Sequence, residues 1–385
     1  MIRTLTAYTT ELDDEESAIE QIISRLGSMD SLQKNTIGIM ACHYEFVLSG
    51  IYKAVCEALP FEVVGTISSA QSVPGESGSL LMTLTVMTSD DVEFIGTVTP
   101  SLMSEPGRVV ADSYKAACRA EKPALVLMFA PFILQNCGDD YVNVITEVSD
   151  GAPCFGTLAV DDTLDFSNCF MLSNGEHYRD RMAMILIYGD IHPRFFVANI
   201  SKSRILEKNA VVTKSAGAVL MEVNGRPVID FFKNLGLVQA SETQYALSNL
   251  PFLLDYNDGT PMVSKIFVTL TPEKYAICAG AMPQGSTLYM TVADKGDVLH
   301  TTGETIDIIL KDIDRSSVLL VYSCISRNMT LGAEQFKEME LISQKIGKKL
   351  LFMTANSGGE ICPTQISEGK AINRFHNNAF IACLI

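Results

Sequence analysis

The sequence lacks an apolar run long enough to cross a membrane, since such a helix needs roughly 20 consecutive apolar residues. Its longest apolar stretches, such as Ala183–Tyr188 and Val318–Tyr322, are much shorter. A basic start followed by an apolar run is also missing, because Glu11, Asp13 and Asp14 stand near the beginning. These absences argue against a membrane partner and a secretory signal, and we expect a cytoplasmic protein.

Clustered cysteines and an excess of basic residues are absent too. The ten cysteines are spread along the chain without a Cys-x-x-Cys pair, so we expect buried thiols in a reducing compartment and no metal site. The net charge of −16 would repel nucleic acid, and a nucleic-acid partner is therefore not expected.

Motifs for nucleotide binding and catalysis are missing as well. The glycines of Gly75–Gly78 and Gly358-Gly359 do not match the dinucleotide fingerprint, and no Gly-x4-Gly-Lys-[Ser/Thr] loop occurs. Cys42 and His43 are adjacent, which places them on opposite faces of a strand and argues against a catalytic pair. We therefore assign no catalytic residue and no cofactor.

What the sequence does contain is one strand–helix–strand layout in three places. The 385 residues are 47% hydrophobic, which is enough for two domains with large cores. Steps of three and four between apolar residues predict a helix in each place, for example Leu48, Ile51, Tyr52 and Val55 in the first. The predicted strand pairs are Thr36–Ala41 with Pro60–Ser69, Ala124–Ala130 with Ala152–Asp161, and Val318–Cys324 with Lys349–Ala355.

Two strands joined by a crossing helix favour parallel pairing. A further strand is predicted after each unit, and two more complete the set: Leu80–Met87, Val92–Val98, Arg181–Tyr188, Phe195–Ile200 and Phe380–Leu384. The predicted fold class is α/β, with two domains of mixed β-sheet and flanking helices, built from repeated β-α-β units.

Turn residues indicate how the parts are joined. Asn174-Gly175 is typical of a hairpin, and a short helix is predicted between Pro227 and Gly236. The polar and basic segment Ile200–Thr213 is predicted to bridge the two halves. We place the domain boundary near residue 222, which gives domains 1–222 and 223–385.

A polar constellation in the last 70 residues is the strongest candidate for a site. Ser323, Cys324 and Arg327 follow a buried strand, Glu360 follows the strand expected beside it, and His376 and Asn377 begin the predicted last strand. Arginine can clamp a carboxylate and glutamate can take an ammonium, so the set could hold a zwitterion. The alternative is an internal Arg327–Glu360 ion pair that only closes the sheet end.

In their order and spacing, several segments resemble the FIST (F-box and intracellular signal transduction) domain family over nearly the whole chain. They are Val64-Gly65-Thr66, Ser68-Ser69-Ala70, Glu222 to Pro227, Met282 to Ser286, Ser323-Cys324 with Arg327, Gly359-Glu360-Ile361, and His376-Asn377. Gln71 stands where the family pattern has an acidic residue.

The resemblance implies an N-terminal and a C-terminal FIST part, a sensory role in signal transduction, and amino acids or related metabolites as ligands. Because the resemblance leaves no room for an output domain, we expect a stand-alone sensor that acts on a separate signalling protein. Ser323, Cys324, Arg327, Glu360, His376 and Asn377 are the expected ligand-binding residues. An enzyme acting on an acyl or amino-acid substrate through Cys324 or His376 is one alternative, and a scaffold protein without a small ligand is another.

Overall fold

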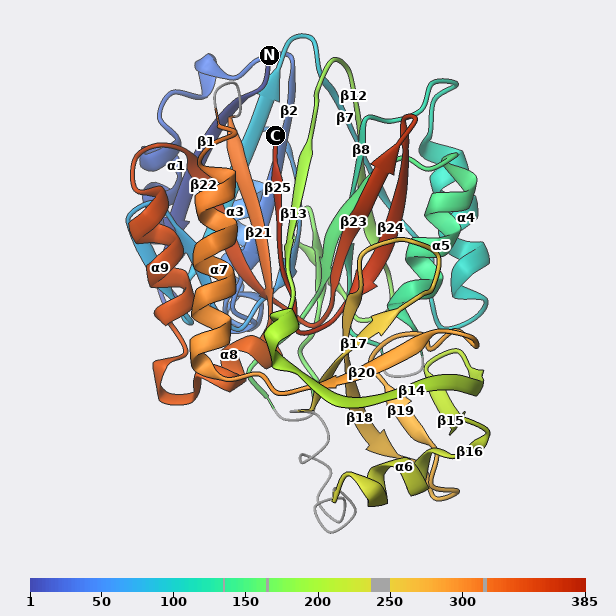
Figure 1. The fold of residues 1–385 in the computed structure, drawn as a ribbon. Helices are drawn as coiled ribbons and strands as arrows, with labels where there is room; N and C mark the ends of the chain where they lie inside the picture. Colours follow the sequence, from blue (N-terminus) through green and yellow to red (C-terminus); the bar gives the residue numbers. More distant parts are fainter. Residues whose placement is uncertain (134–135, 164–165, 237–249, 314–316) are drawn as a thin grey trace.

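The computed structural model describes residues 1–133, 136–163, 166–236, 250–313 and 317–385. This part of the chain is mixed α/β, as the sequence predicts, with a body of three six-stranded sheets and a smaller barrel that lies below it in Figure 1. Within the described ranges, no helix has the length and apolar character needed to cross a membrane.

The first sheet is built around the first predicted unit. Its order is β1 (Arg3–Thr9), β6 (Met82–Ser89), β2 (Asn35–Cys42), β3 (Glu62–Ile67), β10 (Met171–Ser173) and β11 (Glu176–Tyr178). β2 and β3 are parallel, and β6 lies antiparallel to β2. The register confirms the predicted parallel pair and its antiparallel addition.

The second and third sheets repeat this arrangement. The second has the order β24 (Lys370–His376), β23 (Glu360–Ser367), β9 (Cys154–Leu158), β8 (Leu125–Ala130), β12 (Ala183–Tyr188) and β7 (Glu93–Val98). The third has the order β13 (Arg194–Ala198), β25 (Phe380–Leu384), β21 (Val318–Cys324), β22 (Leu351–Ser357), β4 (Gln71–Val73) and β5 (Glu76–Gly78). Each again contains one parallel pair, β8 with β9 and β21 with β22.

The hairpin that follows each β-α-β unit pairs with a strand of a different sheet. The hairpin β4–β5, which follows β3, pairs with β22 of the third sheet. The hairpin β10–β11 follows β9 and pairs with β3, while β23–β24 follows β22 and pairs with β9. The three units are therefore interlocked in a cycle, and this exchange makes β23 and β24 the last two strands at one edge of the second sheet.

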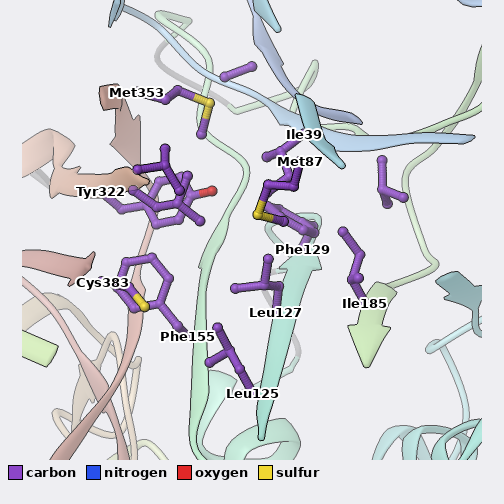
Figure 2. Packing of buried hydrophobic residues seen from close by; sticks show 14 of the residues in the cluster. Ile39, Met87, Leu125, Leu127, Phe129, Phe155, Ile185, Tyr322, Met353 and Cys383 are labelled. Atoms are coloured by element: carbon purple, nitrogen blue, oxygen red, sulfur yellow. The ribbon is translucent and has the colours of Figure 1, made fainter. Parts of the chain in front are cut away.

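Side chains alternate between two cores along the central strands. In β8, Leu125, Leu127 and Phe129 point to the centre of the body, whereas Val126 and Met128 point to the helices outside. Figure 2 shows the central cluster, where Phe155 and Tyr322 from different sheets lie together. Because both faces are covered, these strands read as continuous apolar runs.

Helices cover the outer face of each sheet through their apolar stripes. The first sheet packs against α1 (Glu15–Leu26) and α3 (Ile51–Glu57), and the second against α4 (Pro106–Ala117) and α5 (Gly138–Val148). The third sheet packs against α7 (Lys295–Ile309) and α9 (Lys337–Ile346), which lie on the opposite side of the body from α4 and α5 in Figure 1.

The smaller part is a closed antiparallel barrel. Its order is β14 (Ile205–Ala216), β20 (Thr287–Thr291), β17 (Pro251–Asp255), β18 (Val263–Leu270), β19 (Ala276–Cys278) and β15 (Val219–Val223), and β15 pairs back with β14. β16 (Arg226–Pro227) and α6 (Val228–Asn234) follow β15. Phe232, Phe252 and Phe267 fill the interior. Closure pairs the strand edges that an open sheet of this size would expose.

Of the predictions for single turns and helices, the hairpin turn is confirmed and one helix is wrong. Asn174 and Gly175, with φ of 50° and 85°, form the predicted hairpin turn between β10 and β11. The single helix predicted through Leu48 is wrong, because Gly50 at φ 88° separates α2 (Glu45–Leu48) from α3. Leu48 is 62% exposed and is not part of the apolar face.

The segment Ile200–Thr213, which was predicted to bridge the two halves, leads from β13 of the body into the barrel, but it is not a simple linker. Most of it belongs to β14, which pairs on both sides and buries Ala210 and Val212 in the barrel, whereas Glu207 and Lys214 are exposed. Residue 222, the predicted boundary, falls within β15. The division into 1–222 and 223–385 stays a prediction.

Candidate functional site

All six predicted site residues are buried, with exposed fractions of 2% or less. Ser323 and Cys324 end β21, and Arg327 lies on α8 (Ile325–Leu331), which follows that strand at the barrel side of the body (Figure 1). Glu360 begins β23. His376 ends β24 and does not begin the last strand as predicted, because the chain first completes the β23–β24 hairpin.

Arg327 is held by α7 and α9. Its Nε and Nη2 donate to Oε1 of Glu338 on α9 at 3.1 and 2.9 Å. Nη2 also donates to the carbonyl of Val298 and to the hydroxyl of Thr302 on α7. The ion-pair partner of Arg327 is therefore Glu338, and the direct Arg327–Glu360 pair considered from the sequence is not formed.

Glu338 is a functional neighbour that the sequence reasoning missed. Its second oxygen accepts a hydrogen bond from the Ser323 hydroxyl at 2.6 Å, so one carboxylate links β21, α8 and α9. The available signal was its position four residues before Ile342 of the apolar helix stripe, which places Glu338 on the buried face, where a carboxylate has to be paired.

Glu360 is a buried carboxyl with one oxygen unused. Oε2 accepts from the backbone amide of Ala379 at 3.3 Å, whereas Oε1 has no hydrogen-bond partner among the residues that the structure describes. Burial raises the pKa of Glu360 from 4.5 to about 8, against the opposing effects of Ser357, Cys324 and the charge of Arg327. Near neutral pH, Glu360 is therefore mostly an uncharged acid.

Cys324 lies beside Glu360 and is not an activated thiol. Burial, and then the charge of Glu360, raises the pKa of Cys324 to about 12. Its sulfur accepts from the hydroxyl of Ser326 at 3.2 Å. Catalytic cysteines have depressed pKa values, and this one remains protonated near neutral pH.

His376 lies opposite Glu360 in the antiparallel β23–β24 pair, so the two side chains share one face of the sheet. Its Nε2 lies 3.2 Å from the carbonyl of Cys362 and must carry the proton to donate there. Nδ1 is buried, and no described residue gives it a hydrogen bond. Burial lowers the pKa of His376 to about 4, so the ring is neutral at physiological pH.

Asn377 connects the body to the barrel. Its backbone amide donates to the carbonyl of Ser264 on β18 at 2.9 Å. Both polar atoms of its side chain, Oδ1 and Nδ2, are buried and have no hydrogen-bond partner in the described part of the chain. The hydroxyl of Ser264 is unpaired as well.

A buried ion pair also joins barrel and body, next to the contact between Asn377 and Ser264. Nζ of Lys265 on β18 donates to Asp139 on α5 at 3.0 Å and to the carbonyl of Phe375 at 2.8 Å. Burial has the largest single effect and would lower the pKa of Lys265, but the charge and hydrogen bond of Asp139, together with Tyr256 and Cys137, outweigh burial and the pKa is raised. A Cβ at Gly280 would lie 2.3 Å from Nζ, so glycine is required there.

We name the Lys265–Asp139 pair, Phe375 and the Asn377–Ser264 contact the seam. The sequence reasoning missed the seam residues Lys265 and Asp139. The signal was a lysine inside a strand whose neighbours are mostly apolar, since such a lysine must be paired when the strand is covered.

Glu360 predicts a specific pH dependence of stability. Between about pH 4.5 and 8 the folded state keeps a proton that the unfolded state releases, so the free energy of unfolding falls as the pH rises. Glu360→Gln removes this titration and keeps the shape of the side chain. The free energy of unfolding of wild type, minus that of the variant, should fall by on the order of 1 kcal/mol per pH unit between about pH 5 and 7.5.

Urea denaturation of both proteins across this range measures the difference, and groups that titrate in both proteins cancel, including His376. A difference that does not change with pH would mean that Glu360 is ionised in the folded state throughout.

Two surface grooves lie away from the candidate site. One of about 550 Å³ runs between α7 and α9 and includes Gly303 and Leu341 in its lining. The other, of about 770 Å³, lies at the amino ends of β2 and β3 beside Phe61. Neither is lined by any of the six site residues. No group of three or more potential metal ligands is found in the part of the chain that the structure describes.

Residues 36–226 match the FIST N domain, and residues 229–363 match the FIST C domain. The two matches cover most of the chain, and the protein belongs to the FIST family, whose domains are sensory domains of signal-transduction proteins. Ser323, Cys324, Arg327 and Glu360 lie inside the FIST C match, whereas His376 and Asn377 follow it.

A search of the curated proteins finds no match. Among solved structures, the chain is similar to a cyanuric acid hydrolase from A. caulinodans, with 9% sequence identity and a TM-score of 0.39. That similarity covers 100% of this chain and 99% of the hydrolase. A likeness of this size supports no statement about activity.

Proposed function

We propose that this chain is a sensory module of the cytoplasm that binds a small polar ligand at the buried site and signals to a separate protein. The observation that carries the proposal is the group of unpaired polar atoms. Oε1 of Glu360, Nδ1 of His376 and both side-chain polar atoms of Asn377 are buried, and none has a hydrogen-bond partner within the described ranges.

Buried polar atoms normally have hydrogen-bond partners, and each unpaired one costs roughly 1–3 kcal/mol. Here they occur on neighbouring residues. Glu360 and His376 are paired in register, and Asn377 follows His376 directly. A ligand that satisfies several of these atoms together would recover that cost, which favours a binding site over a purely structural cluster.

The six residues are too deeply buried for a ligand to reach them without movement. The seam is the contact beside Asn377, so its separation would admit a ligand. Binding would then be coupled to a change between barrel and body, which is what a sensor needs to pass on a signal. Amino acids and related metabolites are the first ligands to test.

A thermal-denaturation screen of the full chain against such metabolites tests the proposal, because a ligand that binds only the folded state raises the melting temperature. We expect at least one metabolite to stabilise the protein. Asn377→Leu and His376→Phe should abolish that stabilisation. If no small molecule stabilises the chain, or if both variants respond like wild type, the proposed site is wrong.

Asn373 on the same strand provides the matched control. It is equally buried, but its Oδ1 accepts from the amide of Cys154 and its Nδ2 donates to Thr146 and to the carbonyl of Ala152. Asn373→Leu should lower the free energy of unfolding by about 1–3 kcal/mol because it leaves these buried partners without their hydrogen bonds. Asn377→Leu should leave that free energy unchanged or raise it.

A further inference from the structure

The charges that act on the candidate site are compensated in pairs. The pKa of Glu360 responds to Arg327, and that of His376 responds to Lys265, Asp139 and Arg374. Three ion pairs account for these charges, namely Arg327–Glu338, Lys265–Asp139 and Arg374–Asp258. None of the three leaves an uncompensated charge for a ligand.

Arg327 and Lys265 are also engaged geometrically, whereas Nε of Arg374 is buried without a hydrogen-bond partner among the described residues. The Nε–Nη2 edge of Arg327, which would clamp a carboxylate, already holds Glu338. All the hydrogen bonds of the Lys265 ammonium go to Asp139 and to the carbonyl of Phe375. The zwitterion clamp expected from the sequence therefore lacks its cationic half.

The remaining polar groups are uncharged. Glu360 is mostly protonated near neutral pH because burial raises its pKa to about 8, and the ring of His376 is neutral. The Asn377 side chain offers one donor and one acceptor next to each other, both unused, and it is only 1% exposed. A carboxamide presents the complementary pair of groups in one plane.

We infer that the ligand of this site is an uncharged molecule with a carboxamide-type edge, which the Asn377 side chain holds through two hydrogen bonds. This inference rests on the proposed function and narrows it to one chemical class, which excludes zwitterionic amino acids and keeps uncharged metabolites such as amides. A charged ligand would have to be desolvated in a site without a free opposite charge, and burial of an unpaired charge is strongly unfavourable.

Three probes of nearly equal size separate the possibilities: propionamide, propionate and propylammonium. Each is titrated against the full chain at pH 7 while the melting temperature is recorded, in wild type, Asn377→Leu and Asn373→Leu. We expect propionamide to stabilise wild type with a dissociation constant at least about tenfold lower than either ion, which corresponds to roughly one hydrogen bond. Asn377→Leu should lose this response, and Asn373→Leu should retain it from a lower starting temperature.

Preferential stabilisation by propionate or propylammonium, lost in Asn377→Leu, would overturn the uncharged class and leave the proposed function intact. The same holds if the metabolite screen finds a ligand but propionamide has no effect. Failure of both the screen and the probes would end both proposals. Crystals grown with propionamide that show only ordered water on Asn377 would also overturn the inference.

Discussion

Arg327→Met is expected to lower the free energy of unfolding by about 3–5 kcal/mol, which is the usual effect of removing one partner of a buried ion pair. The variant leaves the Glu338 carboxylate inside the protein with only the hydroxyls of Ser323 and Thr302 as donors. Since Glu338 links β21, α8 and α9, the lower free energy of unfolding should affect the unfolding of the whole body and not only one helix. Urea denaturation followed by circular dichroism measures it.

The double variant Arg327→Met/Glu338→Leu should be less destabilised than Arg327→Met alone, because it removes the uncompensated charge. Arg108→Met is the control, since Arg108 pairs with Glu105 and Asp112 on the surface and should contribute little. A single variant as stable as wild type would show that the Arg327–Glu338 pair is not formed in solution.

Lys265→Met is expected to lower the free energy of unfolding by a similar amount, about 3–5 kcal/mol. This variant acts at the contact between barrel and body. It leaves Asp139 buried at the seam and removes the donor to the carbonyl of Phe375. The barrel should therefore separate from the body more often. Hydrogen exchange should accelerate at the amides of Asn377 and Ala281, which are bonded across the seam.

Lys53→Met is the matched control, because Lys53 is exposed and pairs only with Glu57 on its own helix. It should change neither stability nor exchange at the seam. If Lys265→Met lowers stability but leaves exchange at Asn377 and Ala281 as slow as in wild type, the seam does not open on its own. The route by which we propose that a ligand enters would then be wrong.

The parallel pairs of the body were predictable because the signal is local. Strands such as β8 and β21 are continuous apolar runs, each followed by a helix whose stripe repeats every three or four residues. The alternation of their side chains between the central cluster and the helices follows from strand geometry alone.

The exchange of hairpins between sheets was not predictable in the same way. A hairpin such as β4–β5 carries the same turn and pairing signals whichever strand it joins, and the choice of β22 depends on how three units fit together. The barrel was missed for a related reason. β14 is rich in charged residues because only one of its faces is covered, so its segment resembles a linker.

Whether the candidate residues form a binding site stays a prediction, but the structure shows which of them lie together and which partners they have. Ser323, Cys324, Glu360 and His376 do converge on one end of the body, because the carboxyl ends of neighbouring strands lie together. The partners of Arg327 and Lys265 come from helices, and nothing in strand order identifies them. Ion pairs across elements depend on packing, which a periodicity argument does not resolve.

The amide signals of the Asn377 side chain test the central claim most directly. In protein labelled with ¹⁵N-asparagine, these signals are assigned by their loss in Asn377→Leu, and those of Asn373 serve as the internal reference. We predict that a stabilising ligand shifts the Asn377 signals to a saturating new position and leaves those of Asn373 in place. Unmoved Asn377 signals at a ligand concentration that raises the melting temperature would contradict the account, since the ligand would then bind elsewhere.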